Sequence, residues 1–339
     1  MMPQKQQGLF PIIRHGNRKM RSRSLAGVLG VLALLILTTT SAPAYPDRPV
    51  RILIAFPAGG TIDTLGRIIA QKLTEIWGQN VVIENRPGGG GNIGAAAAAK
   101  SAPDGYTIHF GAQSLAVNAT LQPSRDFDAV ADFDPIILVG TAQDVLLVPL
   151  SSPFHSVKEL IDYARRHPGE LNYGSLGTGT SGHLATVMFC DLAGIRLQHV
   201  PYTSVSQATT DIMSGRLAVF LPTLGGHIGN VTGGRLRALA VSGPQRAVQL
   251  PDVPTFNELG VKFVDETSWY ALFAPKGTPA DIIGKVNADV ERILAMPDVK
   301  ERGVTLGYRY VGGPPQRLAQ FLKGEIAKWT EVAKSASLN

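Results

Sequence analysis

The sequence predicts an α/β protein of two lobes, joined by strands that cross from one lobe to the other. Strand-like and helix-like segments alternate along the chain, which is typical of sheets covered by helices. The 339 residues are too many for one ordinary hydrophobic core. No segment has the composition of a long flexible linker, which suggests that strands rather than a tether connect the lobes.

The predicted strands are apolar runs, and their alternation with helices favours mainly parallel sheets. They are expected at Val50–Phe56, Asn80–Glu84, Tyr106–Gly111, Asp134–Val148, Leu171–Ser175, Gln198–Pro201, Leu217–Phe220, Leu236–Val241 and Ser268–Ala274. Two apolar runs could cross between the lobes, near residue 146 and near residue 270. If both cross, lobe 1 comprises residues 45–146 and 270–339, and lobe 2 comprises residues 147–269.

Helices are expected between the strands. The first follows the glycines of "AFPAGGTID", where Thr61 or Asp63 can cap it. The second, "GNIGAAAAAKSA", is rich in alanine, the best helix former. The third, "SVKELIDYARRHPG", has Ser156 as its cap and Glu159 as the reciprocal partner. The last is predicted over residues 315–333, where apolar residues recur at helical spacing.

Residues 1–44 have the form of a secretory signal peptide. A basic segment precedes the 13 apolar residues Leu25–Leu37, and Ala42-Pro43-Ala44 then forms a small-x-small cleavage motif before Tyr45. A membrane anchor is the alternative, but a helix that spans a bilayer needs about 20 apolar residues. We therefore expect a secreted protein that begins near Tyr45.

Charge and cysteine content exclude other classes. The formal net charge is +6, and residues 1–44 carry six basic and no acidic residues. The remaining chain is therefore formally neutral, which argues against a nucleic-acid-binding surface. Cys190 is the single cysteine, so an intramolecular disulfide is impossible, and its helical context predicts a buried structural thiol rather than a nucleophile.

Two glycine-rich motifs resemble nucleotide-binding loops without completing them. "GTGTSG", Gly177–Gly182, matches G-x-G-x-x-G, but the expected acidic residue is missing from Arg196–Tyr202. "RPGGGGNIG" lacks the Lys-Ser/Thr of a P-loop and is interpreted as a flexible turn rather than a ligand contact. No cofactor is therefore expected.

A catalytic or metal site is equally hard to assemble. Ser175 lies in "YGSLG", where Tyr173 replaces the first glycine of a nucleophile elbow. The histidine spacings match no common metal motif. His183 either orients its loop or contacts a ligand. Asp63 would repel a bound carboxylate unless it caps its helix, which we favour, or meets an ammonium or hydroxyl group of the ligand.

Two loops, "PAGGTID" and "SLGTGTSGH", each connect a strand to a helix, one in each predicted lobe. They offer backbone amides and hydroxyls but no base, nucleophile or metal. A helix N-terminus contributes on the order of 0.3–1 kcal/mol to a bound anion, whereas a carboxylate buried without such partners is strongly disfavoured. The pair of loops therefore predicts a site for a charged solute between the lobes.

Nearly end to end, the chain from Tyr45 resembles the Bug family, the periplasmic solute-binding proteins of tripartite tricarboxylate transporters. The resemblance rests on the order and spacing of "YPDRPVRILIAFPAGGTIDTLGRIIAQKL", "VVIENRPGGGGNIGAAAAAKSAPDGYT", "LNYGSLGTGTSGHLA", "HVPYTSVSQATTDIMSGRL", "LRALAVSGPQRAVQLPDVPTFNELG" and "WYALFAPKGTP". It implies a type II periplasmic-binding-protein fold that closes like a flytrap around a small carboxylate. It also implies a periplasmic monomer without a cofactor, whose partners are the membrane subunits of a transporter.

The resemblance also implies which residues bind the ligand: Ala58, Gly59, Gly60, Thr61, Asp63, Gln113, Ser114, Ser175, Thr178, Gly179, Thr180, Ser181, His183, Tyr202 and Thr203. Many relatives read "VPYKG" where this chain reads "VPYTS", and the missing lysine argues against a highly charged ligand such as citrate. Pro222 and Thr223, together with Gln113 and Ser114, are expected to set specificity. A secreted enzyme on the same fold and a receptor for a signalling partner remain alternatives.

Overall fold

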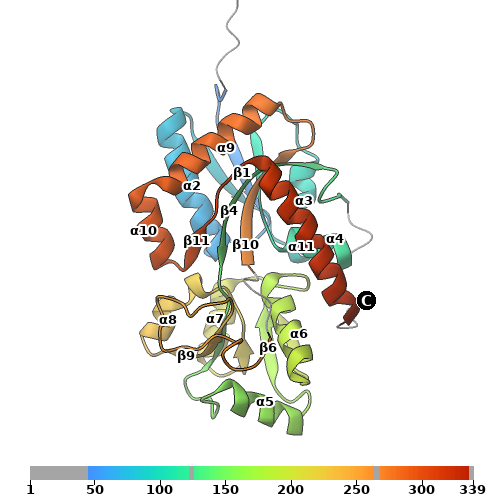
Figure 1. Ribbon diagram of the computed structural model, residues 1–339, viewed down its shortest axis with the longest axis vertical. Coiled ribbons are helices and arrows are strands. Elements are labelled where there is room, and N and C mark those ends of the chain that lie inside the picture. The colour runs from blue at the N-terminus through green and yellow to red at the C-terminus, as the bar shows by residue number, and fades with distance from the viewer. Residues whose placement is uncertain (1–44, 122–125, 263–267, 336–339) are drawn as a thin grey trace, which may run out of the picture. The chain divides into compact units, whose positions relative to one another are not determined.

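The computed structural model describes residues 45–121, 126–262 and 268–335 of the chain (Figure 1). Within these ranges the chain forms ten α-helices, labelled α2 to α11, and eleven strands, β1 to β11. The predicted signal peptide lies outside the described residues. No described helix combines the length and the apolar character that a membrane span requires.

The larger sheet has six strands in the order β11-β4-β10-β3-β1-β2. Their bounds are β1 Val50–Ile54, β2 Val81–Asn85, β3 Thr107–Ala112, β4 Phe133–Ala142, β10 Ser268–Pro275 and β11 Tyr308–Tyr310. Strand β1 pairs in parallel with β2 and β3, whereas β10 runs antiparallel to both β3 and β4. Strand β11, which sequence analysis did not anticipate, is antiparallel to β4 at the edge.

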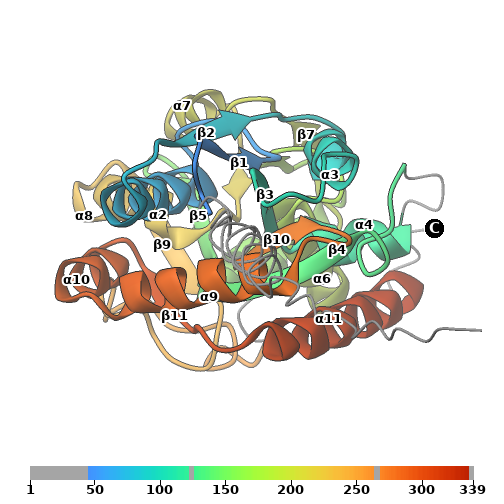
Figure 2. The same ribbon diagram turned by 90° about the horizontal axis from the view of Figure 1, so that it is seen from above.

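Helices cover both faces of the larger sheet (Figure 2). One face carries α2 Thr61–Trp77, α9 Ala280–Ala295 and α10 Pro297–Thr305, and the other carries α3 Asn92–Ala99, α4 Ser114–Leu121 and α11 Pro315–Ser335. Leu65 and Val290 are fully buried on the first face, and Ala98 and Leu318 on the second. Both faces of the sheet are therefore buried, as a sheet with helices on two sides requires.

The smaller sheet has five strands in the order β7-β6-β8-β5-β9. Its strands are β5 Val145–Pro149, β6 Asn172–Ser175, β7 Gln198–Pro201, β8 Val219–Phe220 and β9 Leu236–Val241. Its helices are α5 Val157–Arg166, α6 Ser181–Ala193, α7 Val205–Met213 and α8 Ile228–Thr232. Two short 3₁₀ helices, η1 Gly89–Gly91 and η2 Leu224–Gly226, precede α3 and α8.

The prediction of mainly parallel sheets is wrong. Among the described strands, four pairs are parallel and five are antiparallel. The physical reason is the crossing itself: the run predicted as one strand over Asp134–Val148 is two strands, β4 in the larger sheet and β5 in the smaller. The chain passes from β4 to β5 through Gln143 and Asp144. It returns after β9 through β10, which therefore runs against its neighbours.

The four helices named from sequence are present as α2, α3, α5 and α11. At α5, the Ser156 hydroxyl accepts the amide N–H of Glu159 at 3.2 Å, as predicted. The Glu159 carboxylate, however, accepts the amide N–H of His155 at 2.6 Å. The Glu159 side chain therefore bonds the amide of the residue before the N-cap, and not the amide of Ser156 as a capping box predicts.

Candidate functional site

A cavity of about 100 Å³ lies between the two sheets, where loops from both lobes meet. Its walls come from the β1–α2 loop, the β6–α6 loop, the start of α7, the segment from β8 through η2, and β10. The lining residues are Phe56, Pro57, Gly59, Gly60, Thr61, Ile62, Ala112, Ser175, Leu176, Thr180, Ser181, Gly182, Val205, Phe220, Pro222, Thr223, Gly226, His227 and Tyr270. In open α/β sheets, ligands bind in crevices at the carboxyl ends of strands, which is the position of both loops here.

In the β1–α2 loop, the backbone turns sharply before α2 begins. Gly59 has φ +83°, a left-handed conformation that glycine adopts without strain. Gly60 is the N-cap of α2 and has an ordinary φ of −81°. The expectation that Thr61 or Asp63 caps α2 is therefore wrong, because the cap position is one residue earlier and carries no side chain. The N-terminal amides of α2 face the cavity without a side-chain cap.

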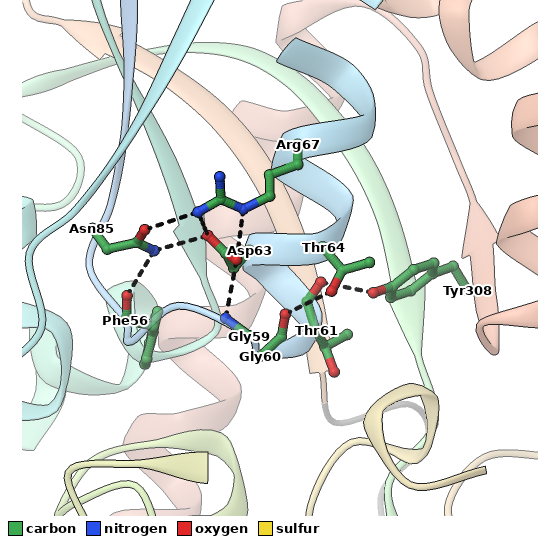
Figure 3. Close-up of polar contacts among 9 residues, drawn as sticks. All are labelled: Phe56, Gly59, Gly60, Thr61, Asp63, Thr64, Arg67, Asn85 and Tyr308. Atoms are coloured by element: carbon green, nitrogen blue, oxygen red, sulfur yellow. Dashed lines mark hydrogen bonds and ion pairs between the residues drawn. The ribbon is translucent and has the colours of Figure 1, made fainter. Parts of the chain in front are cut away.

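The Asp63 carboxylate braces this loop from behind (Figure 3). It is 3% exposed and accepts hydrogen bonds from the Gly59 amide at 3.0 Å, from Arg67 at 2.9 and 3.0 Å, and from Asn85 at 3.0 Å. Asn85 also donates to the carbonyl of Phe56 at 3.1 Å. Burial alone would raise the pKa of Asp63, but the hydrogen bonds from Arg67, Gly59 and Asn85 outweigh it and lower the pKa.

This geometry explains how an acidic residue can lie beside a predicted anion site. Asp63 does not line the cavity, and the Arg67 guanidinium neutralises its charge. The pair therefore leaves no net negative charge behind the loop. The loop is further anchored by Tyr308, whose hydroxyl donates to the carbonyl of Thr61 at 2.7 Å (Figure 3).

The β6–α6 loop uses hydroxyls and imidazoles in place of ions. The Ser175 hydroxyl accepts the Gly177 amide at 3.0 Å, and the Thr180 hydroxyl donates to the Gly177 carbonyl at 2.7 Å. The Gly179 amide donates to His183 Nδ1 at 3.4 Å, so His183 orients its loop and does not line the cavity. Burial, aided by the neighbouring imidazole of His199, lowers the pKa of His183 to about 4.

Ser175 and His199 form a contact that sequence reasoning missed. Ser175 Oγ lies 2.7 Å from His199 Nε2, a distance at which a base can activate a nucleophile. Residues 175 and 199 lie on adjacent parallel strands, β6 and β7, and only strand register could have revealed the pair. Among the described residues, no carboxylate contacts the other nitrogen of His199. The contact therefore lacks the orienting acid of a triad and instead fixes the Ser175 hydroxyl.

The predicted ligand residues fall into two groups. Six of them line the cavity: Gly59, Gly60, Thr61, Ser175, Thr180 and Ser181. The other nine do not line it: Ala58, Asp63, Gln113, Ser114, Thr178, Gly179, His183, Tyr202 and Thr203. Ala58, Thr178 and Thr203 are exposed, whereas Gln113 and Ser114 are buried next to Ala112, which lines the cavity. The Tyr202 hydroxyl donates to Asp211 at 2.9 Å.

The apolar and aromatic walls were not predicted as parts of the site. They include Phe56, Ile62, Val205, Phe220 and Tyr270. Such residues look like ordinary core positions in sequence, so only the three-dimensional structure identifies them. Pro222 and Thr223, which were expected to influence specificity, do line the cavity.

The third glycine loop, "RPGGGG", brings the two lobes together beside the cavity. A Cβ atom at Gly90 would lie 2.2 Å from the carbonyl oxygen of Thr178, so the backbones of the two loops are in direct contact there. Gly90 also has φ +63°. The loop does not line the cavity, as expected, but it is a point of contact between lobes rather than only a turn.

Cys190 is half-buried in α6 and packs against the hydrophobic core. Burial raises the pKa of its thiol to about 12, which makes it a poor nucleophile. Among the described residues, no group of three or more histidine, cysteine or acidic side chains could hold a metal ion.

Comparisons with known proteins place this geometry in a family. The model of the tripartite tricarboxylate transporter family receptor matches residues 65–338. A protein from Pseudomonas sp. (strain P51), described as the UPF0065 protein in the tcbD-tcbE intergenic region, is 37% identical over 94% of this chain and 95% of its own length. Protein BugT of Bordetella pertussis is 33% identical over 92% of this chain and 98% of its own length.

Solved structures agree with the sequence matches. R. palustris Rpa4515 with adipate has a TM-score of 0.83 and 35% identity, covering 86% of this chain and 98% of that chain. MatC from Rhodopseudomonas palustris with bound malate has a TM-score of 0.81 and 29% identity, covering 85% and 99%. These relatives are two-lobe binding proteins rather than enzymes, and they bear out the predicted type II periplasmic-binding-protein fold. The chain therefore belongs to the receptors of the tripartite tricarboxylate transporter family, which includes the Bug proteins.

Proposed function

We propose that the chain is a periplasmic receptor that holds a small carboxylate between its lobes and delivers it to the membrane subunits of a tripartite transporter. The observation that carries this proposal is the convergence of two helix N-termini, those of α2 and α6, on one cavity. Neither terminus has a side-chain cap, so both offer backbone amides to an anion. Relatives bound to adipate and to malate support the same ligand class.

We infer that the ligand carboxylate is held by amides and hydroxyls of the two loops. The candidates that line the cavity are Gly60 and Thr61 in the first loop, and Ser175, Thr180 and Ser181 in the second. The remaining predicted residues do not contact the ligand but hold the two loops in place. Asp63 and His183 do so by accepting hydrogen bonds from loop amides.

The lining favours a ligand of low charge with an apolar body. Among the residues that the structure describes, no lysine or arginine lines the cavity. Burial lowers the pKa of His227 to about 4, so its imidazole is neutral at pH 7. Two helix N-termini offset much less charge than a tricarboxylate carries. Phe56, Val205 and Phe220 offer apolar contact to an aliphatic chain. A mono- or dicarboxylate therefore fits this wall better than citrate.

We propose two lobes built on the two sheets, which correspond to residues 45–146 with 270–339 and to residues 147–269. The passage from β4 to β5 through Gln143 and Asp144 supports a first crossing a few residues before 146. We further propose that residues 1–44 are removed as a signal peptide and that the mature protein is a monomer. Mass spectrometry of secreted protein tests the first point, and light scattering during gel filtration tests the second.

A binding screen on purified residues 45–339 tests the function. Thermal-shift measurements with adipate, malate, citrate and amino acids should give the largest increase in melting temperature with a dicarboxylate. Calorimetric titration should then show one site per chain. Failure of every carboxylate to bind contradicts the proposal. The contact between Ser175 and His199 makes the enzyme alternative worth testing in the same screen. Chemical conversion of a bound ligand, detected by NMR, would favour that alternative.

A further inference from the structure

Asp144 occupies the connection between the two sheets. It is fully buried and follows β4 directly before β5. Its carboxylate accepts a hydrogen bond from the hydroxyl of Ser268, the first residue of β10, at 2.9 Å. Its backbone exchanges two hydrogen bonds with Ser242, the residue after β9, at 2.8 and 2.9 Å. Asp144 therefore lies in the first segment that carries the chain between lobes and contacts the second segment at Ser242 and Ser268.

A single residue, Thr223, separates the Asp144 carboxyl group from the cavity. Thr223 lies opposite Asp144 in an antiparallel bridge, donates a hydrogen bond to its carboxylate, and lines the cavity. Thr223 Oγ1 also lies 3.4 Å from the hydroxyls of Ser268 and Tyr270. Tyr270 lines the cavity as well. A solute in the cavity would therefore contact the Thr223 hydroxyl. Whether that hydroxyl points its proton at Asp144 or at the solute depends on the protonation state of Asp144.

Burial makes the charge of this carboxyl group sensitive to pH near neutrality. It raises the pKa of Asp144 to about 7, while the hydrogen bonds from Ser268 and Thr223 act in the opposite direction. Burial removes the water that would otherwise hydrate the charged form of this carboxyl group. The group therefore exchanges a proton in the range where a periplasmic receptor works.

Among the described residues, the titratable neighbours with shifted pKa values change charge outside this range. From β10, Tyr270 has a pKa raised by burial, and from β11, Tyr308 does too. From the turn after η2, His227 has a pKa lowered by burial to about 4. Also on β11, Arg309 pairs in register with Thr141, three residues before Asp144.

Protonation of Asp144 changes what Thr223 can offer a ligand. When Asp144 is ionised, Thr223 donates its single hydroxyl proton to the carboxylate and turns its lone pairs toward the cavity. When Asp144 is protonated, it can itself donate a hydrogen bond, which leaves the Thr223 proton for the ligand. A ligand carboxylate is therefore repelled in the first state and bonded in the second.

We propose that Asp144 is a positioning residue that couples proton uptake to carboxylate capture through the Thr223 hydroxyl. This inference rests on the proposed function, because it assumes a carboxylate in the cavity. It adds that the affinity for carboxylates rises as the pH falls through neutrality. It also assigns a specificity role to a residue that does not touch the ligand.

Calorimetric titration of residues 45–339 with adipate and with malate, between pH 5.5 and 8.5, tests the proposal. In wild type, the dissociation constant should increase with pH, approaching about tenfold per unit at the alkaline end. Titration in phosphate and in Tris should show proton uptake on binding at pH 7.5. Asp144→Asn should remove both the pH slope and the proton uptake. Asp162→Asn, at a half-buried position of α5 far from the connection between the sheets, is the matched control and should retain both.

Thr223→Val provides a second variant in case Asp144→Asn does not fold. It keeps Asp144 but removes the hydroxyl, and it should flatten the pH slope while weakening binding most at low pH. A pH-independent dissociation constant in wild type overturns the inference and leaves the proposed function standing. A slope that persists in Asp144→Asn or in Thr223→Val also overturns it. If neither acid binds at any pH, the proposed function itself fails.

Discussion

An ion pair braces the β1–α2 loop, whereas neutral hydroxyls and imidazoles brace the β6–α6 loop. Asp63 and Arg67 hold the first loop through charges that cancel behind it. His183 holds the second loop by accepting the Gly179 amide on an uncharged ring nitrogen, and His199 contacts the Ser175 hydroxyl. The two loops thus present similar backbone amides to one cavity through different chemistry. The difference implies that they respond differently to pH and to substitution.

The largest effect is expected when a negative charge is introduced into one of the two loops. Gly60→Asp should abolish carboxylate binding, because a new carboxylate would face the amides of α2 and repel the ligand. The fold should persist, because Gly60 has an ordinary φ and a Cβ there meets nothing closer than 3.7 Å. Calorimetry and circular dichroism measure the two effects. Gly284→Asp, at an exposed position of α9, is the control and should bind normally.

The contact between the lobes should respond next most strongly. Gly90→Ala should weaken carboxylate binding by about 1–3 kcal/mol, the usual scale of overpacking, because its Cβ would clash with the Thr178 carbonyl. Gly234→Ala is a matched control, since Gly234 has a similar φ of +65° but no atom within 4 Å of the added Cβ. Gly234→Ala should lower the stability of the protein without lowering its affinity for the carboxylate. Equal affinities of the two variants would show that this contact does not support binding.

The two braces should lose stability in different pH windows. The pKa of His183 lies near 4, below its ordinary value, so its contribution to stability is present above about pH 6.5 and lost as the pH falls toward 4. The pKa of Asp63 is also lowered, so its contribution is lost only below its ordinary value of about 4.

Urea unfolding at pH 7 and pH 5 separates these effects. His183→Gln should lose less stability on acidification than wild type, by up to about 2 kcal/mol. Asp63→Asn should lower the free energy of unfolding by a similar amount at both pH values. If Asp63→Asn changes the pH dependence in this range and His183→Gln does not, the assignment of the two braces is reversed.

The smallest expected effect distinguishes two threonines of one loop. Thr180→Ala should weaken binding by about 0.5–1.5 kcal/mol, since Thr180 lines the cavity and its hydroxyl donates to the Gly177 carbonyl. Thr178→Ala should change affinity less, because the Thr178 side chain is exposed and the contact with Gly90 is made by the backbone carbonyl, which the substitution keeps. Calorimetric titration of both variants measures the difference. A larger loss in Thr178→Ala would favour the placement expected from family resemblance.

Local patterns predicted much of this fold but not its tertiary pairings. The apolar runs predicted β7 and β9 with their observed bounds, and the cap at Ser156 predicted the start of α5. Strand direction was wrong, because the run over residues 134–148 continues through a change of sheet that hydrophobicity does not mark. Both loops of the site were found from glycines before helices. Tyr270 was missed because it looks like a core residue of β10.

Second-sphere contacts were the least predictable part of the site. The role of Asp63 depends on Asn85, which lies on another strand, and the contact between Ser175 and His199 depends on the register of β6 and β7. Asp144 showed no motif in sequence, because its importance comes from burial between two crossing segments. Such features arise from tertiary packing, which no local pattern encodes.

The central claim is that amides from both loops hold one carboxylate. Titration of ¹⁵N-labelled residues 45–339 with adipate, followed by NMR, tests this most directly. The account predicts that the amide signals of Gly60 and Thr61 in one lobe, and of Thr180 and Ser181 in the other, shift together and saturate with one dissociation constant. Shifts confined to a single loop, or two different dissociation constants for the two loops, would contradict it.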